Sequence, residues 1–165
     1  MNSKLLHLLT APGVILHELG HLVFCLFSGV QIYKVKFFGF GHTAGFVQHA
    51  EPQSFVQSLS ISFGPLLFNS LVSLVLFSQF GPPYLSIKNF LILWLGAVSG
   101  LHAMPSSGDA NTLFAITAHK IKRNPLAIVG FPFVGLIHLL NFLKRFHLQP
   151  VYVVLLFWLG NIYLK

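Results

Sequence analysis

Long runs of apolar residues dominate this chain, and short stretches that carry most of the polar and charged residues separate them. A helix needs about 20 apolar residues to cross the hydrocarbon core of a bilayer. Runs at 5–30, 55–80 and 85–104 have that length, and two further runs lie at 125–143 and 150–164. The pattern predicts an all-α polytopic membrane protein with about five membrane helices, in which residues 1–165 form a single domain.

The segment at 30–50, between the first two runs, has a different period. Tyr33, Val35 and Phe37 alternate with Lys34 and Lys36, which is the spacing of a half-buried strand. The sequence GFGH that follows is typical of a turn, and AGFVQHA can return as a second strand. We therefore expect a small β-hairpin at the membrane surface, directly after the first helix.

Composition agrees with a membrane protein whose main partner is the lipid bilayer. Charged residues make up 8% of the chain, whereas soluble domains carry about 25%. The net charge of +7 reflects a shortage of acids, and the cations are scattered, which argues against nucleic acid as a partner. Cytoplasmic loops carry an excess of Lys and Arg. An N-terminus outside the cell is favoured by six cytoplasmic cations against four: Lys34, Lys36, Lys120, Lys122, Arg123 and Lys165 against Lys4, Lys88, Lys144 and Arg145.

The first apolar run contains HELGH, in which His17, Glu18 and His21 form the pattern H-E-x-x-H. Residues four apart share one face of a helix, so both imidazoles can bind a single metal ion. Zinc lowers the pKa of a bound water to about 7, and a neighbouring glutamate can then act as general base. The pattern predicts a Zn²⁺ site with His17 and His21 as ligands and Glu18 as the catalytic residue.

The alternative is that these three residues form a chance cluster without a ligand. In a soluble helix such a cluster would often lie on the surface. Here His17 lies about 18 Å along the helix from Leu5, at ~1.5 Å per residue. An acid near the middle of a membrane costs roughly 2.5–3.5 kcal/mol on insertion scales. Because of this cost, a functional metal site explains the three residues better than a chance cluster does.

A catalytic zinc site usually has three protein ligands and one open position. Besides Glu18, the acids of the chain are Glu51 and Asp109. Glu51 precedes Pro52 in a predicted surface loop, where a solvated role is expected. Asp109 lies in HAMPSSGDANTLF, which interrupts the helix, and non-helical backbone at membrane depth lines protein or a watery cavity. Asp109 is therefore the predicted third ligand. A compatible alternative makes it the N-cap of a helix that begins at ANTLFAI.

Four segments, HELGH, GVQIYKVKFFGFG, GPLLFN and HAMPSSGDA, together resemble the site-2 protease family of intramembrane zinc metalloproteases. Members carry H-E-x-x-H on one core helix, then a membrane-associated hairpin, then a Gly-Pro-x-x-x-Asn-like element, and Asn-x-x-Pro-x-Pro-x-x-Asp-Gly on the third helix. The resemblance covers residues 12–114 and looks closer to compact, divergent members without a PDZ-like or other accessory domain. It implies a zinc-dependent endopeptidase that hydrolyses peptide bonds in or near membrane segments of a membrane-protein substrate, with His17, His21 and Asp109 as metal ligands.

The third motif departs from the family pattern. His102 stands near the family's asparagine, the spacing to the acid is one residue shorter, and Ala110 replaces the glycine after Asp109. Three roles are open for His102. It can act as a catalytic residue that polarises the scissile carbonyl, it can replace the asparagine, or it can pack at a helix end.

Polar residues outside these motifs are expected to have structural roles. Asn69, inside the second run, is expected to hydrogen-bond between helices. Six histidines show no ligand spacing with one another, and loop, interfacial or packing roles are expected for them: His7, His42, His49, His119, His138 and His147.

Two other functions are open alternatives. One is a catalytically inactive metal-binding relative that holds membrane partners. The other is a metal transporter or haem-binding membrane protein that uses intramembrane histidines. Haem would need histidines that face each other across helices and would not need Glu18, while a transporter would show polar positions recurring through several runs. The expected location is the cell membrane, most simply a prokaryotic plasma membrane, as a multi-pass protein.

Overall fold

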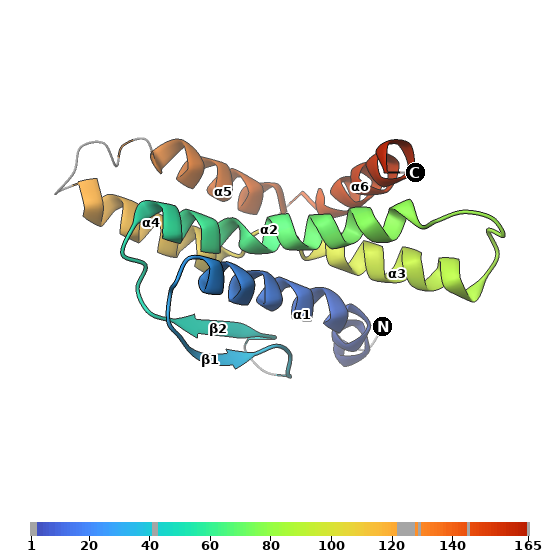
Figure 1. The fold of residues 1–165 in the computed structure, drawn as a ribbon, viewed down its shortest axis with the longest axis horizontal. Coiled ribbons are helices and arrows are strands. Elements are labelled where there is room, and N and C mark those ends of the chain that lie inside the picture. The colour runs from blue at the N-terminus through green and yellow to red at the C-terminus, as the bar shows by residue number, and fades with distance from the viewer. Residues whose placement is uncertain (1–2, 41–42, 122–127, 129, 145, 165) are drawn as a thin grey trace.

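The computed structural model describes residues 3–40, 43–121, 128, 130–144 and 146–164. These residues form six helices and a two-stranded antiparallel sheet (Figure 1): α1 Ser3–Phe27, β1 Ile32–Lys36, β2 Phe46–His49, α2 Phe55–Ser78, α3 Ile87–Leu101, α4 Ser107–Ile121, α5 Phe131–Lys144 and α6 Gln149–Tyr163. The predicted mostly helical fold, with a small hairpin after the first helix, is confirmed.

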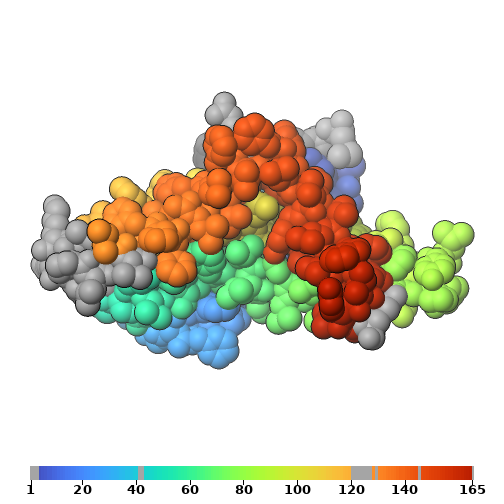
Figure 2. All heavy atoms as spheres, turned by 90° about the horizontal axis from the view of Figure 1, so that it is seen from above, coloured from blue at the N-terminus to red at the C-terminus, as the bar shows by residue number. Residues whose placement is uncertain are grey.

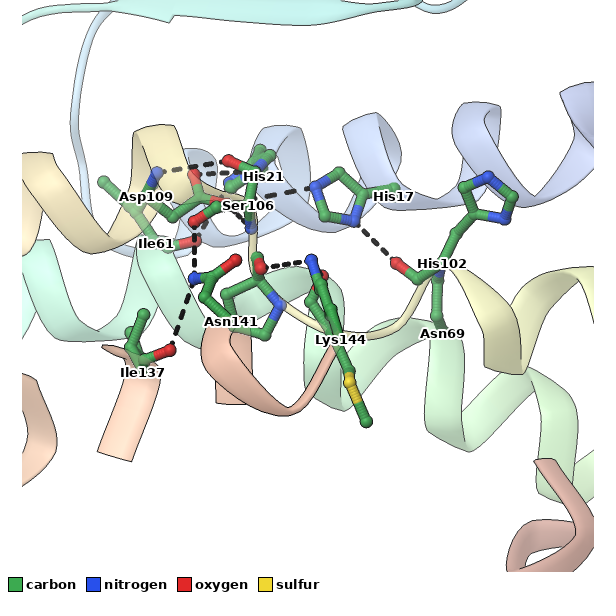
Figure 3. A network of polar contacts seen from close by, with 12 residues as sticks. His17, His21, Ile61, Asn69, His102, Ser106, Asp109, Ile137, Asn141 and Lys144 are labelled. Carbon is green, nitrogen blue, oxygen red and sulfur yellow. Dashed lines mark hydrogen bonds and ion pairs between the residues drawn. The ribbon is translucent and has the colours of Figure 1, made fainter. Parts of the chain in front are cut away.

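Helix α2 lies at the centre of the arrangement (Figure 1). Helix α1 packs along one side of α2, the hairpin lies beyond α1, and α5 and α6 lie on the opposite side (Figures 1 and 2). Helices α3 and α4 follow one another beside α2 and are separated by the non-helical residues 102–106. This break lies next to the middle of α1, which is the part of that helix that carries HELGH (Figure 3).

Helices α1 and α2 approach each other closely where small residues meet. A Cβ atom placed on Gly20 would lie 2.7 Å from Pro65 Cα, and one placed on Gly64 would lie 2.9 Å from Gly20 O. Both distances are shorter than van der Waals contact, so these positions require glycine, as is common between membrane helices. Gly20 lies inside HELGH, and its contact fixes how the face bearing His17 and His21 is set against α2.

Asn69 is fully buried in α2 and joins three helices. Its Nδ2 donates to Gly13 O in α1 and to Ser99 O in α3, each at 3.3 Å. Its backbone O accepts from Ser99 Oγ at 2.9 Å. The predicted interhelical hydrogen bonding of Asn69 is confirmed, and it ties α1 to the end of α3 just before residues 102–106.

The hairpin packs on the C-terminal end of α1 and the first half of α2. Its strands pair with Val35 opposite Val47 and Lys36 opposite Phe46. Val47 and neighbouring apolar side chains cover a buried cluster formed by Cys25, Val30 and Ile61. The hairpin is therefore held beside α1 by a small core of its own.

The prediction of about five membrane helices is confirmed only in part. Helices α1 and α2 are long and apolar enough to cross a membrane, while α5 and α6 pass the same test only together, as one bent span. Helix α3 has 15 residues, which is roughly 22 Å and shorter than the ~30 Å hydrocarbon core. It is shorter than the run at 85–104 because Ser86 caps its start and the chain leaves the helix at His102.

After residue 104 the helices differ from those that the apolar runs predicted. Residues 107–121 form the helix α4, which the hydrophobic runs did not predict as a span. Pro132, inside the run at 125–143, lies in the first turn of α5, where the missing N–H is not needed. The predicted start of a helix at 125 lies outside the described residues. So do one of the predicted loop histidines and four of the cations that bear on orientation: His42, Lys122, Arg123, Arg145 and Lys165.

Candidate metal centre

His17 and His21 lie one turn apart on α1, and both rings point toward the start of α4 (Figure 3). Their ring centroids are 5.0 Å apart. Asp109, in the first turn of α4, faces them from the other side. Its Oδ1 lies 3.3 Å from His21 Nε2, and its Oδ2 lies 4.0 Å from His17 Nε2. The structure thus brings the three predicted ligands to one place.

The hydrogen bonds of both imidazoles leave Nε2 available for a metal ion. His17 Nδ1 lies 2.7 Å from the backbone O of His102, and His21 Nδ1 lies 3.0 Å from the backbone O of Ile61. A carbonyl oxygen can only accept, so each Nδ1 carries the hydrogen and donates it. In the neutral ring Nε2 then presents its lone pair, and both Nε2 atoms face Asp109. Such backbone carbonyls are the usual means of orienting metal-binding histidines.

Asp109 is held by the residue that precedes its helix. Ser106 N donates to Asp109 Oδ2 at 2.6 Å, and Asp109 N donates to Ser106 Oγ at 3.1 Å. This reciprocal pair is a capping box. The alternative that makes Asp109 the N-cap is therefore wrong, because Ser106 caps α4 and leaves Asp109 Oδ1 free to face His21.

The three residues fit a zinc ion. Two ligand atoms at 2.0–2.1 Å from zinc in a tetrahedron lie roughly 3.3 Å apart, and the three ligand atoms here all lie within 4.8 Å of one another. Side-chain rotations of about 1 Å at the ligand atoms would complete the coordination distances. Two imidazole nitrogens and a carboxylate oxygen are a donor set that zinc favours. All three side chains are at most 15% exposed, so the centre is shielded from bulk water.

Glu18 lies beside the ligands with 7% of its surface exposed. Within the described part of the chain its carboxylate has no hydrogen-bond partner. It lines a cavity of about 760 Å³ that the three ligands also line. The hairpin closes the cavity beside it, since a Cβ atom placed on Gly45 would lie 2.6 Å from Glu18 Cγ. Glu18 is therefore placed to exchange a proton with a molecule in this cavity.

No family model, curated protein or solved structure matches this chain. The resemblance to site-2 proteases stays a prediction, and the candidate centre depends on its own geometry.

His102 is the C-cap residue of α3. Its backbone O receives the hydrogen bond from His17, and its ring Nδ1 lies 2.9 Å from Val98 O, one turn earlier. His102 also lines the cavity. Of the three roles considered for His102, these contacts agree with that of a histidine packed at a helix end. A role of its ring toward a substrate stays a prediction.

Sequence reasoning missed several residues at this site. Lys144 lines the cavity, although the sequence indicated only a loop charge at this position. His7 and His49 line it as well, where loop, interfacial or packing roles were expected. Asn141 and Lys144 lie three residues apart and thus on one face of an apolar helix. Two polar side chains on one face of an apolar helix were the feature of the sequence that could have indicated this contact. Glu51 is exposed after β2 and outside the cluster, as expected for a solvated residue.

Proposed function

We propose that this chain is an intramembrane zinc metalloprotease of the site-2 protease type. The observation that carries the proposal is the convergence of His17, His21 and Asp109, with both Nε2 atoms turned toward the Asp109 carboxylate, beside a cavity that Glu18 also lines. In the proposal α1 and α2 span the cell membrane, and the remaining helices pack with them in the bilayer as a multi-pass unit with its N-terminus outside.

Exposed apolar side chains support the membrane placement. Helices α5 and α6 present large apolar side chains on their outer faces: Phe131, Phe133, Leu136, Leu139, Phe142, Val151, Val154, Leu155, Trp158 and Ile162. In water such a surface would promote association, whereas hydrocarbon chains cover it without cost. Lipid is therefore the proposed partner of these faces.

The mechanism assigns one task to each residue. A zinc ion held by His17, His21 and Asp109 would supply a Lewis acid that polarises a peptide carbonyl and lowers the pKa of water. Glu18 accepts the proton that the attacking water loses as its oxygen bonds to the carbonyl carbon. Glu18 then gives that proton to the amide nitrogen as the C–N bond breaks, so the products are a carboxylic acid and an amine. The carbonyls of His102 and Ile61 keep the two imidazoles in the ligating tautomer.

The substrate is proposed to be a membrane segment of another protein that is locally unwound. Among the residues that the structure describes, β2 pairs with β1 along one edge and with no strand along the other. Phe46, Val47 and His49 of β2 line the cavity. An extended segment can add to a free strand edge through backbone hydrogen bonds. The hairpin thus offers a place where a peptide lies alongside Glu18.

Metal analysis of the full chain purified in detergent tests the proposal. Wild type should bind zinc near one equivalent, and His17→Ala and Asp109→Ala should lose most of it. Glu18→Gln should keep zinc but lose the cleavage of apolar fluorescence-quenched peptides in the same detergent. Stoichiometric zinc in both ligand variants would refute the metal assignment, and undiminished cleavage by Glu18→Gln would refute the mechanism.

A second candidate function, a structural ion pair without a metal ion, is favoured by one distance. His21 Nε2 and Asp109 Oδ1, at 3.3 Å, can also form an ion pair with a protonated imidazole and no metal. That arrangement would make the cluster structural. It predicts no bound zinc in the wild type and loss of stability in Asp109→Ala, so the same metal analysis separates the two.

A further inference from the structure

Helix α5 contacts the candidate centre through two polar side chains. Lys144 Nζ donates to Met104 O at 2.9 Å and also to Pro105 O. Asn141 Nδ2 donates to Ser106 O at 3.1 Å. Three consecutive backbone carbonyls between α3 and α4 are thus bound by one turn of α5 (Figure 3).

These carbonyls belong to the segment that carries the third ligand. Residues 102–106 are non-helical, and Met104 and Pro105 are buried, so their carbonyl groups need donors from elsewhere in the protein. Ser106 ends this segment, and its N and Oγ hold Asp109 through the capping box. A shift of the segment would therefore move Asp109 relative to His17 and His21.

We infer that Lys144 and Asn141 are positioning residues for the metal centre, which hold residues 104–106 so that Asp109 meets the two histidines of α1. This inference depends on the proposed function, because it assumes that the three residues bind zinc. Helix α5 lies outside the stretch that carries the sequence motifs, and the inference gives it a role in the metal centre. Lys144 and Asn141 touch neither metal nor substrate in this role and act through Asp109.

The charge of Lys144 and its hydrogen bonds act on metal affinity in opposite directions. An ammonium group near a divalent cation repels it, so the loss of this charge alone would tighten metal binding. Loss of the hydrogen bonds to residues 104–105 would weaken metal binding, because Asp109 would no longer be held in place. Lys144→Met removes both the charge and the donors, and the direction of its effect shows which contribution is larger. Asn141→Leu removes a donor without a change in charge.

The experiment measures Zn²⁺ affinity by competition with a chromophoric chelator, on the full chain in detergent. Lys144→Met and Asn141→Leu should each weaken binding about 10–100-fold, which is the usual effect of losing a group that orients a metal ligand. The visible absorption of Co²⁺ bound in place of Zn²⁺ should change in both variants. Lys88→Met, which removes an exposed lysine at the start of α3, should leave affinity and spectrum as in wild type.

The outcomes distinguish a failure of the positioning role from a failure of the proposed zinc site. Unchanged or tighter binding in Lys144→Met and Asn141→Leu, with weaker binding in Asp109→Ala, would overturn the inference and leave the zinc site in place. Unchanged binding in Asp109→Ala would remove the proposed function itself. A lower unfolding temperature without any change in metal affinity would mean that α5 only satisfies buried carbonyls, which also overturns the inference. If Lys144→Met does not fold, Asn141→Ala, at a half-buried position, applies the same criterion.

Discussion

Gly45 provides a test of where Glu18 acts, because the hairpin backbone there lies against the glutamate side chain. The Cβ atom of an alanine at position 45 would lie 2.6 Å from Glu18 Cγ and 2.9 Å from Phe37 O. Carbon atoms pack best at about 3.5–4.0 Å, so the Glu18 side chain must retreat by roughly 1 Å. The Phe37 carbonyl also lies too close to the new methyl group, and because it is backbone it cannot swing away as a side chain can. Gly45→Ala should therefore displace the proposed general base.

The size of the effect follows from that displacement. A misplacement of about 1 Å at a reacting group can lower a rate about 100-fold. Complete loss of a general base lowers it by about 10²–10⁴-fold, which sets the upper limit. We expect Gly45→Ala to reduce kcat for the quenched apolar peptides about 100-fold while Zn²⁺ affinity stays at the wild-type value, because the three atoms nearest to the new methyl group belong to Glu18 and Phe37 and none belongs to a proposed ligand.

Gly39→Ala is the matched control on the same hairpin. Its Cβ atom would meet the Cε and Nζ atoms of Lys36, at 2.5 and 2.8 Å, which are the far end of a flexible side chain and can swing away. This variant should keep wild-type kcat. Full activity in Gly45→Ala would show that Glu18 does not depend on the space beneath the hairpin, and an equal loss in both variants would mean that the hairpin, and not Glu18, was disturbed.

Three further predictions concern packing and metal. Asn69→Ala should lower the free energy of unfolding in detergent by about 0.6–1.7 kcal/mol, the usual range for polar contacts between membrane helices. Gly20→Ala should lower it by about 1–3 kcal/mol because the new methyl group meets Pro65 backbone. Gly135→Ala, whose added Cβ atom would meet nothing within 4 Å, should not destabilise the protein. A strong chelator should release the metal and stop cleavage, because the ion would be held only by reversible coordination to the three side chains. Zinc at pH 7 should restore cleavage.

The apolar runs predicted the positions of most helices. Length and hydropathy located α1, α2, α3 and α6 to within a few residues, because an apolar segment of this size buries itself best as a helix. Hydropathy alone does not show where a helix is capped, so the predicted number of membrane helices is confirmed only in part. Ser86 and His102 bound α3 at 15 residues, and neither residue interrupts the apolar pattern enough to be noticed.

The candidate centre was predictable where its spacing is local. His17 and His21 share a helix face by their spacing of four, and Asp109 was found because acids are scarce in this chain. The contacts of Lys144 and Asn141 were not predictable, since they depend on how α5 folds back over residues 104–106. The backbone carbonyls of Ile61 and His102 leave no mark in a sequence at all, because every residue has one.

The hydrogen-bond partners of His17, His21 and Asp109 show how the candidate centre and the packing of the helices are linked in this fold. His17 is oriented by the end of α3, His21 by α2, and Asp109 by Ser106, which α5 holds in turn. A polar group buried in an apolar setting is costly unless it is paired, so each helix that packs here also satisfies one atom of the centre. Metal affinity should therefore report on helix packing. A substitution that separates α1 from α2, such as Gly20→Ala, should weaken zinc binding although it touches no ligand, whereas Gly135→Ala should not.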